Sequence, residues 1–381
     1  DRLRSRGLGD VYKRQVNEEI KLLVEKYAKG LDNGTNLSAK PLDNLKALKE
    51  TLSRNTTKII FSAKQSNPKG NKKKTFSATD LPQYAEYTQT IIDLYSSINK
   101  LLPWQYGVVI QRMKSILKPE YLIAAVKTAK AEPYSFADLI IKAMDYKGVR
   151  ENVFPDYVRN DALGIKTCVY CNAQFAVTAE TEPSLTPAMI KKRGKRRGRK
   201  PQPRPAILRA NYELDHNLPK SVYPYLCTNF YNLIPCCSSC NKHKSKYPLD
   251  FTIYAKNGDD LEPLYFELPT DDLLKFQLRH VCGGLHVELK DRVGGTLAEE
   301  FNKRFAIDAI YKEHSEEIRE LLWRHKIYSS SGIAALKDGF KDLFQDGFDI
   351  DRFVLGTYAD TQDVFKRPLT IMKQDIMKQL I

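Results

Sequence analysis

Two Cys-x-x-Cys pairs in the middle of the chain set the strongest condition on its fold. The pairs are Cys168/Cys171 and Cys237/Cys240. Four thiolates in two such pairs form the ligand set of a tetrahedral structural zinc site. The spacing therefore predicts that one Zn²⁺ ion holds two distant segments together, and that loss of any one of these cysteines unfolds the surrounding core. Cys236 is a rival ligand, but only Cys237 keeps the two-residue spacer.

The composition indicates a globular protein that binds a polyanion. Its 381 residues are 42% hydrophobic and 28% charged, which is typical of a chain with two or three domains. We find no apolar stretch of the roughly 18 to 20 residues that a membrane span needs and no signal sequence, so we expect a cytoplasmic protein with reduced cysteines and no membrane partner. A net charge of +15 favours nucleic acid as the partner.

A second set of possible metal ligands lies between and beside the cysteine pairs. Asp215 and His216 are adjacent, and Asn241 directly follows Cys240. Carboxylate and amide oxygens suit Mg²⁺ or Mn²⁺, whereas thiolates suit zinc. The sequence therefore predicts two chemically distinct metal sites, one structural and one catalytic.

Taken in order, these motifs resemble the HNH endonuclease family. The ββα-metal core of that family reads Cys-x-x-Cys, Asp-His-x-x-Pro, Asn-Leu and Cys-x-x-Cys-Asn-x-x-Lys. The matching stretches are Cys168–Cys171, Asp215–Pro219, Asn232–Leu233 and Cys237–Lys244. The resemblance covers about residues 165–248 and rests on the ordered set, since each motif alone is weak. It implies an α+β fold with a zinc-clamped ββα core, and a metal-dependent endonuclease that hydrolyses phosphodiester bonds of DNA, most simply double-stranded DNA.

The resemblance also assigns roles to individual residues. His216 would be the general base, and Asp215 and Asn241 would bind the catalytic divalent metal. Asn232 would steady the His216 loop through side-chain to backbone hydrogen bonds. Successive residues on a strand point to opposite faces, so Asp215 and His216 converge only if the strand bends. His243 competes with Asn241 as a ligand, but a two-residue step turns a helix by about 200°, so both cannot face one site.

Basic residues provide candidate nucleic-acid contacts. Lys244 lies three residues after Asn241 on the same helix face and either meets a phosphate or is solvated. An insertion at residues 189–205 is rich in Lys, Arg, Gly and Pro and cannot fold alone. It is either a solvated loop or a segment that grips phosphates without reading sequence. Its predicted contacts are Lys191, Lys192, Arg193, Lys195, Arg196, Arg197, Arg199 and Lys200.

The pattern of apolar and polar residues changes along the chain and predicts four parts. Residues 1–15 resemble a non-native leader, 16–150 a helical region, 151–250 the zinc-clamped core, and 251–381 a small sheet followed by helices. Within these parts we expect a loop at Lys69–Lys74, a helix at Ala124–Ala131, a hairpin of strands Gln174–Thr178 and Ala206–Asp215, and a strand at Phe276–Leu278.

Two other functions remain open from the sequence. The first is a zinc-stabilised nucleic-acid-binding module that does not cleave. The second is a toxin-like or phage-defence effector nuclease that a partner such as an ATPase activates. The presence of Asp215, His216 and Asn241 together favours cleavage over the inactive module.

Overall fold

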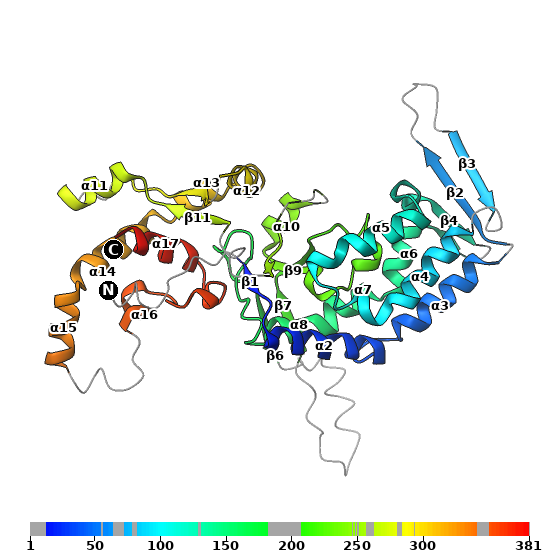
Figure 1. Ribbon diagram of the computed structural model, residues 1–381, viewed down its shortest axis with the longest axis horizontal. Helices are drawn as coiled ribbons and strands as arrows, with labels where there is room; N and C mark the ends of the chain where they lie inside the picture. The colour runs from blue at the N-terminus through cyan, green and yellow to red at the C-terminus, as the bar shows by residue number, and fades with distance from the viewer. Residues whose placement is uncertain are drawn as a thin grey trace, which may run out of the picture.

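The computed structural model shows a mixed helix and strand protein in which short sheets alternate with helices (Figure 1). The structure describes residues 13–54, 56–63, 72–77, 82–128, 131–181, 207–245, 247, 249, 251–256, 263–279, 284–292, 294–340 and 350–380. The α+β class expected from the sequence is confirmed.

The N-terminal region is mainly helical. Helix α2 begins after Asn17, whose side chain accepts a hydrogen bond from the Ile20 amide at 2.9 Å, and ends at Gly34, where φ is +69°. Buried apolar residues on one face of each helix form the core of this region. The helices are α2 (Glu18–Asn33), α3 (Pro41–Leu52), α4 (Gln83–Ile98), α5 (Tyr106–Ile116), α6 (Phe136–Ala143), α7 (Tyr146–Gly148) and α8 (Phe154–Val158).

This region also contains a sheet that the sequence analysis missed. Four antiparallel strands lie in the order β3-β2-β4-β5. The helix expected at Ala124–Ala131 is wrong, because Val126 pairs with Ile59 and with Tyr134 in the sheet. The loop expected at Lys69–Lys74 is wrong for residues 72–74, which belong to β3. The strands are β2 (Lys58–Ala63), β3 (Lys72–Ser77), β4 (Ala125–Thr128) and β5 (Ala131–Ser135).

The central region contains two separate strand pairs followed by a short helix. Strands β6 (Val177–Thr181) and β7 (Ile207–Asn211) form one antiparallel pair. Strand β8 (Glu213–His216) pairs with β9 (Leu233–Cys236), and α10 (Ser238–Lys244) follows directly. The expected hairpin is confirmed where Val177 and Thr178 pair with Asn211 and Ala210, but its extension to Asp215 is wrong, since Asp215 pairs with Ile234 of β9. A strand–strand–helix unit results.

The C-terminal region joins two-stranded sheets to helices. Strand β1 (Arg14–Gln15) runs parallel to β10 (Tyr254–Ala255), and β11 (Leu264–Glu267) is antiparallel to β12 (Glu288–Asp291). The strand expected at Phe276–Leu278 is wrong, because these residues lie in an amphipathic helix that buries Phe276. The helices are α11 (Thr270–Arg279), α12 (Leu297–Phe305), α13 (Ile307–Lys312), α14 (Ser315–Ile327), α15 (Ser330–Gly339), α16 (Ile350–Leu355) and α17 (Thr370–Leu380).

The central unit lies between the N-terminal helices and the C-terminal helices, so both flanking regions contact it (Figure 1). On one side the Tyr27 hydroxyl of α2 donates to the Thr228 carbonyl at 2.7 Å. On the other side the Tyr311 hydroxyl of α13 donates to the Cys171 carbonyl at 2.8 Å. Both hydrogen bonds are buried, which ties the position of the central unit to the rest of the protein.

Candidate metal centre and active site

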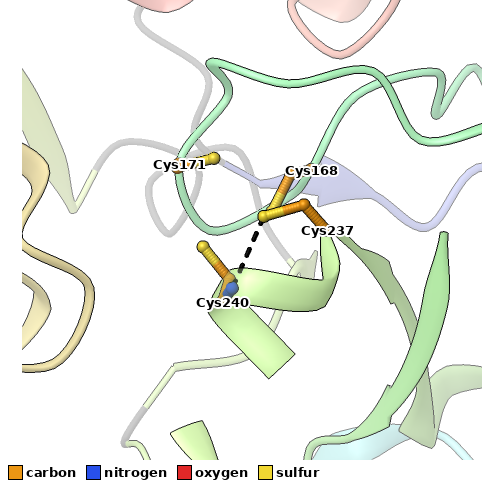
Figure 2. Close-up of side chains that lie close together, drawn as sticks. All are labelled: Cys168, Cys171, Cys237 and Cys240. Carbon is orange, nitrogen blue, oxygen red and sulfur yellow. Dashed lines mark hydrogen bonds between the residues drawn. The ribbon is translucent and has the colours of Figure 1, made fainter. Parts of the chain in front are cut away.

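The four cysteines of the two Cys-x-x-Cys pairs converge on one point. Cys168, Cys171, Cys237 and Cys240 are all buried, and their sulfur atoms lie within 4.8 Å of one another. Figure 2 shows one pair arriving from a loop and the other from the start of α10. In a tetrahedral site with Zn–S distances of about 2.3 Å, neighbouring sulfurs are about 3.8 Å apart. The cluster could therefore hold a zinc ion after small side-chain adjustments.

Local structure favours Cys237 over its neighbour as a ligand. Cys237 caps the N-terminus of α10, and its sulfur accepts a hydrogen bond from the Cys240 amide at 3.5 Å (Figure 2). Hydrogen bonds from the other cysteines, Cys168 foremost, hold the pKa of Cys237 below its ordinary value, which favours the thiolate. Cys236 lies outside the cluster, with its sulfur 3.7 Å from the Glu213 carbonyl oxygen.

Asp215 receives one partner from each of the two cysteine-bearing segments. The Tyr170 hydroxyl donates to Oδ2 of Asp215 at 2.5 Å, and the Lys244 ammonium lies 2.7 Å from the same oxygen. Tyr170 is part of the spacer between Cys168 and Cys171, and Lys244 is on α10. The two cysteine-bearing segments therefore also determine where the Asp215 carboxylate points. The sequence analysis did not select Tyr170, although its place inside the first spacer was visible.

Lys244 is neither solvated nor positioned as a surface contact for phosphate, in contrast to both sequence-based expectations. Its side chain is fully buried, and its ammonium also donates to the His216 carbonyl at 2.9 Å. The physical reason is that α10 packs one face directly on β8, so a lysine on that face meets the strand before it can reach solvent. Because side chains alternate between the two faces of β8, Asp215 lies on the face that this lysine contacts.

Asn241 and Glu213 form the second polar contact between α10 and β8. The Asn241 amide donates to Glu213 Oε2, and Glu213 precedes Asp215 by two residues on the same face of the strand. His243 is exposed, and its Nδ1 atom lies 3.5 Å from the Ser239 hydroxyl. The helix geometry thus supports Asn241, and not His243, as the residue that faces β8. Glu213 was missed, although the period of two along a strand could have revealed it.

The donor set at the α10–β8 contact has the chemistry of a hard-cation site. Asp215, Glu213 and Asn241 offer carboxylate and carboxamide oxygens, the ligand type that Mg²⁺ and Mn²⁺ prefer. In this structure the Lys244 ammonium is the cation at Asp215. A divalent ion bound by Asp215 would have to share or displace that ion pair.

His216 lies on the other side of β8 from Asp215. The strand pairs regularly through His216 and Leu233, so no bend within it brings the two side chains together. The His216 ring packs against the Tyr146 ring at a centroid distance of 4.8 Å, and Nε2 lies 3.0 Å from the Cys227 carbonyl oxygen. Burial foremost, with help from the positive charge of Lys220, lowers the pKa of His216 to about 3.

The contact with Cys227 determines the tautomer of His216. A carbonyl oxygen can only accept a hydrogen bond, so Nε2 carries the proton and Nδ1 carries the lone pair of the neutral ring. The imidazole is therefore held in a form that can accept a proton at Nδ1.

Asn232 ties both ends of the loop that separates His216 from Cys227. Its side chain accepts from the Leu218 amide at 2.7 Å and donates to the carbonyls of Leu218 at 3.2 Å and Leu226 at 3.0 Å. The residue is fully buried. These three bonds hold the loop that leads to the Cys227 carbonyl, which in turn orients His216.

The N-terminal helices anchor the chain immediately after Cys227. The Asn229 side-chain amide donates to the carbonyls of Ile98 at 2.6 Å and Leu101 at 2.9 Å. Its side-chain oxygen accepts from the Tyr106 hydroxyl at 2.7 Å. All of these contacts link α4, α5 and the intervening turn to the segment that positions His216. The helical region is therefore part of the structure that builds the site.

The predicted phosphate contacts Lys191, Lys192, Arg193, Lys195, Arg196, Arg197, Arg199 and Lys200 lie outside the described residues. Among the helices that the structure describes, none combines the length and the apolar character that a membrane crossing requires. Comparison of the chain with protein-family models, with curated proteins and with solved structures gives no match.

Proposed function

We propose that the protein is a metal-dependent endonuclease that hydrolyses phosphodiester bonds of DNA. The observation that carries this proposal is the hydrogen bond between His216 Nε2 and the Cys227 carbonyl, because it leaves Nδ1 of a neutral imidazole as the proton acceptor. The order β8, β9, α10 with its four-cysteine clamp supports the resemblance to the HNH family. The net charge of +15 supports nucleic acid as substrate.

In the proposed reaction His216 accepts a proton from the attacking water at Nδ1. Because its side chain lies on the other side of β8 from Asp215, the water and the metal-bound phosphate would have to meet at the end of the strand. Asp215 and Asn241 would hold the divalent ion, which supplies positive charge at the phosphate and at the leaving 3′ oxygen. Tyr170 and Lys244 orient the Asp215 carboxylate through the contacts described above. Asn232 keeps the loop around His216 in place through its backbone hydrogen bonds. The protein thus contributes a positioned base, oxygen ligands and a rigid frame.

The ion pair between Lys244 and Asp215 supports a second candidate function. If that buried pair is purely structural, the protein would be a zinc-stabilised nucleic-acid-binding module that does not cleave. The intact His216 geometry favours the nuclease, since a binding module has no need for a proton acceptor held in one tautomer.

A plasmid-nicking assay separates the two functions. Wild-type protein should nick supercoiled DNA with Mg²⁺ or Mn²⁺ and not with EDTA, and His216→Ala should lower the rate by about 100-fold or more. His243→Ala is the matched control, because this exposed histidine on α10 should leave nicking unchanged. DNA binding without nicking under all metal conditions would favour the binding module. Nicking that requires a co-encoded partner would favour the activated effector.

A further inference from the structure

Lys220 carries a positive charge in the loop that follows β8, and the proposed function gives it no role. The Pro219 carbonyl accepts hydrogen bonds from the Val222 amide at 3.0 Å and from the Tyr223 amide at 2.9 Å, so the backbone at Lys220 is held in a tight turn. Val222 is 38% exposed, which places this turn at the surface. The side chain of Lys220 is half-buried, so it is fixed beyond the end of β8 while it stays open to solvent.

Lys220 and His216 contact the same aromatic ring. The Lys220 ammonium lies 4.3 Å from the centroid of the Tyr146 ring, and the His216 ring lies 4.8 Å from the same centroid. Tyr146 is buried, and its hydroxyl lies 3.4 Å from the Leu214 carbonyl oxygen of β8. The ring that holds the ammonium is thus packed against the strand that carries His216. A cation–π contact with a fixed ring therefore positions Lys220 beside the proposed base.

The Lys220 ammonium lacks a counter-charge within the part of the chain that the structure describes. No carboxylate there forms an ion pair with it, and the negative charges of Asp138 and Asp215 act on it only at longer range. Arg150 adds a second positive charge nearby. The buried Lys244 has the opposite arrangement, because it pairs with Asp215 at 2.7 Å. A partly desolvated ammonium without a partner is costly, and an anion that binds beside it relieves that cost.

A phosphate of the substrate is the anion that fits this position. In the proposed reaction the attacking water and the metal-bound phosphate meet at the end of β8, and Lys220 follows that end by four residues. A lysine ammonium binds phosphate as a compact point charge and needs no further geometry. The site would then have a divalent ion on the Asp215 side of the phosphate and an ammonium on the His216 side.

We propose that Lys220 binds the phosphate whose ester bond is hydrolysed. The inference deepens the proposed nuclease function and rests on it for the reaction. Lys220 takes no part in proton transfer: His216 accepts the proton of the water, and the bond from phosphorus to the leaving 3′ oxygen breaks. The ammonium stabilises the negative charge of the phosphoryl oxygens while that bond breaks.

The first test measures DNA binding without cleavage. Full-length protein is titrated into a labelled DNA duplex in buffer without added divalent metal, and anisotropy is recorded at several salt concentrations. Lys220→Met should weaken binding by about fivefold at 0.1 M salt and lower the slope of log affinity against log salt by about 0.9, the value for one lost phosphate contact. Lys220→Arg should keep the wild-type slope, because it keeps the charge.

A lysine elsewhere in the protein provides the matched control. Lys326 also lies over an aromatic ring, at 5.8 Å from the centroid of Trp323, but it belongs to α14. Lys326→Met should leave both the salt slope and the nicking rate unchanged.

The second test separates a contact at the scissile phosphate from a distant grip on DNA. Nicking is measured with protein in excess and at saturating concentration, so that weaker binding no longer affects the rate. Lys220→Met should lower this rate by about 100-fold, and Lys220→Arg should restore most of it. The urea midpoint of Lys220→Met should stay close to that of the wild type, because the side chain is only half-buried.

The outcomes distinguish this inference from the proposed function. An unchanged salt slope in Lys220→Met, an unchanged nicking rate at saturation, or a loss that coincides with a lower urea midpoint and persists in Lys220→Arg would each overturn the role of Lys220. A smaller slope in Lys220→Met together with no nicking by the wild type would overturn the nuclease function and leave a phosphate contact at Lys220. Nicking by the wild type at the same rate as Lys220→Met would do the reverse.

Discussion

The buried ion pair between Lys244 and Asp215 makes a sharp prediction about stability. Lys244→Met removes the ammonium while keeping an unbranched apolar side chain of similar length. Lys244 is fully buried and Asp215 is 5% exposed, so the remaining carboxylate cannot be rescued by bulk water. Of the two contacts to Asp215 Oδ2 described above, only the hydrogen bond from the Tyr170 hydroxyl is left after the change.

The expected loss is about 3 to 5 kcal/mol of unfolding free energy, the usual cost of removing one partner from a buried pair. Asp215→Asn should also destabilise, because it leaves the Lys244 ammonium buried without its counter-charge. The double variant removes both charges and should be at least about 2 kcal/mol more stable than the sum of the two single changes predicts. This recovery distinguishes an ion pair from independent packing effects.

The measurement is urea unfolding of zinc-loaded protein followed by circular dichroism, with the free energy taken from midpoint and slope. Lys21→Met is the matched control, because its pair with Glu18 at 2.6 Å is exposed and should be worth about 0.5 kcal/mol or less. The reasoning would be refuted if Lys244→Met cost less than about 1 kcal/mol, or if the two single changes were simply additive.

Two further predictions concern the zinc cluster and the His216 loop. The purified chain should carry one zinc by elemental analysis, and Cys240→Ser should lose both the metal and cooperative unfolding; retention of either would contradict a structural zinc. Asn232→Ala removes three buried side-chain hydrogen bonds and should lower the urea unfolding free energy by about 3 kcal/mol, whereas the exposed Asn211→Ala should change it little. Equal changes in unfolding free energy for Asn232→Ala and Asn211→Ala would show that the Asn232 hydrogen bonds do not stabilise the loop.

Spacing rules worked where the relevant geometry is local. The two-residue spacer selects Cys237 over Cys236, and the four cysteines do gather in one buried cluster. The rotation per residue in a helix separates Asn241 from His243, and the structure turns Asn241 toward β8 and His243 toward solvent. Covalent geometry within one turn decides both outcomes, so no knowledge of distant residues is needed.

Local propensity failed where tertiary contacts override it. Residues 125–128 follow a helix-compatible pattern, yet they form β4 because β2 and β5 provide strand partners on both sides. The strand partner of Asp215 was also misjudged, because strand pairing is decided between segments and not within one of them. Neither error could be corrected from a single local window.

The amino-acid order of this chain is sufficient to predict the four-cysteine cluster, the positive net charge and the candidate catalytic residues. Only the folded structure shows that Lys244 is buried against Asp215, that Tyr170 and Glu213 complete the polar contacts, and that the Cys227 carbonyl sets the tautomer of His216. The reason is physical. Ligand type and charge belong to single residues, whereas burial and hydrogen-bond partners depend on which distant segments pack together.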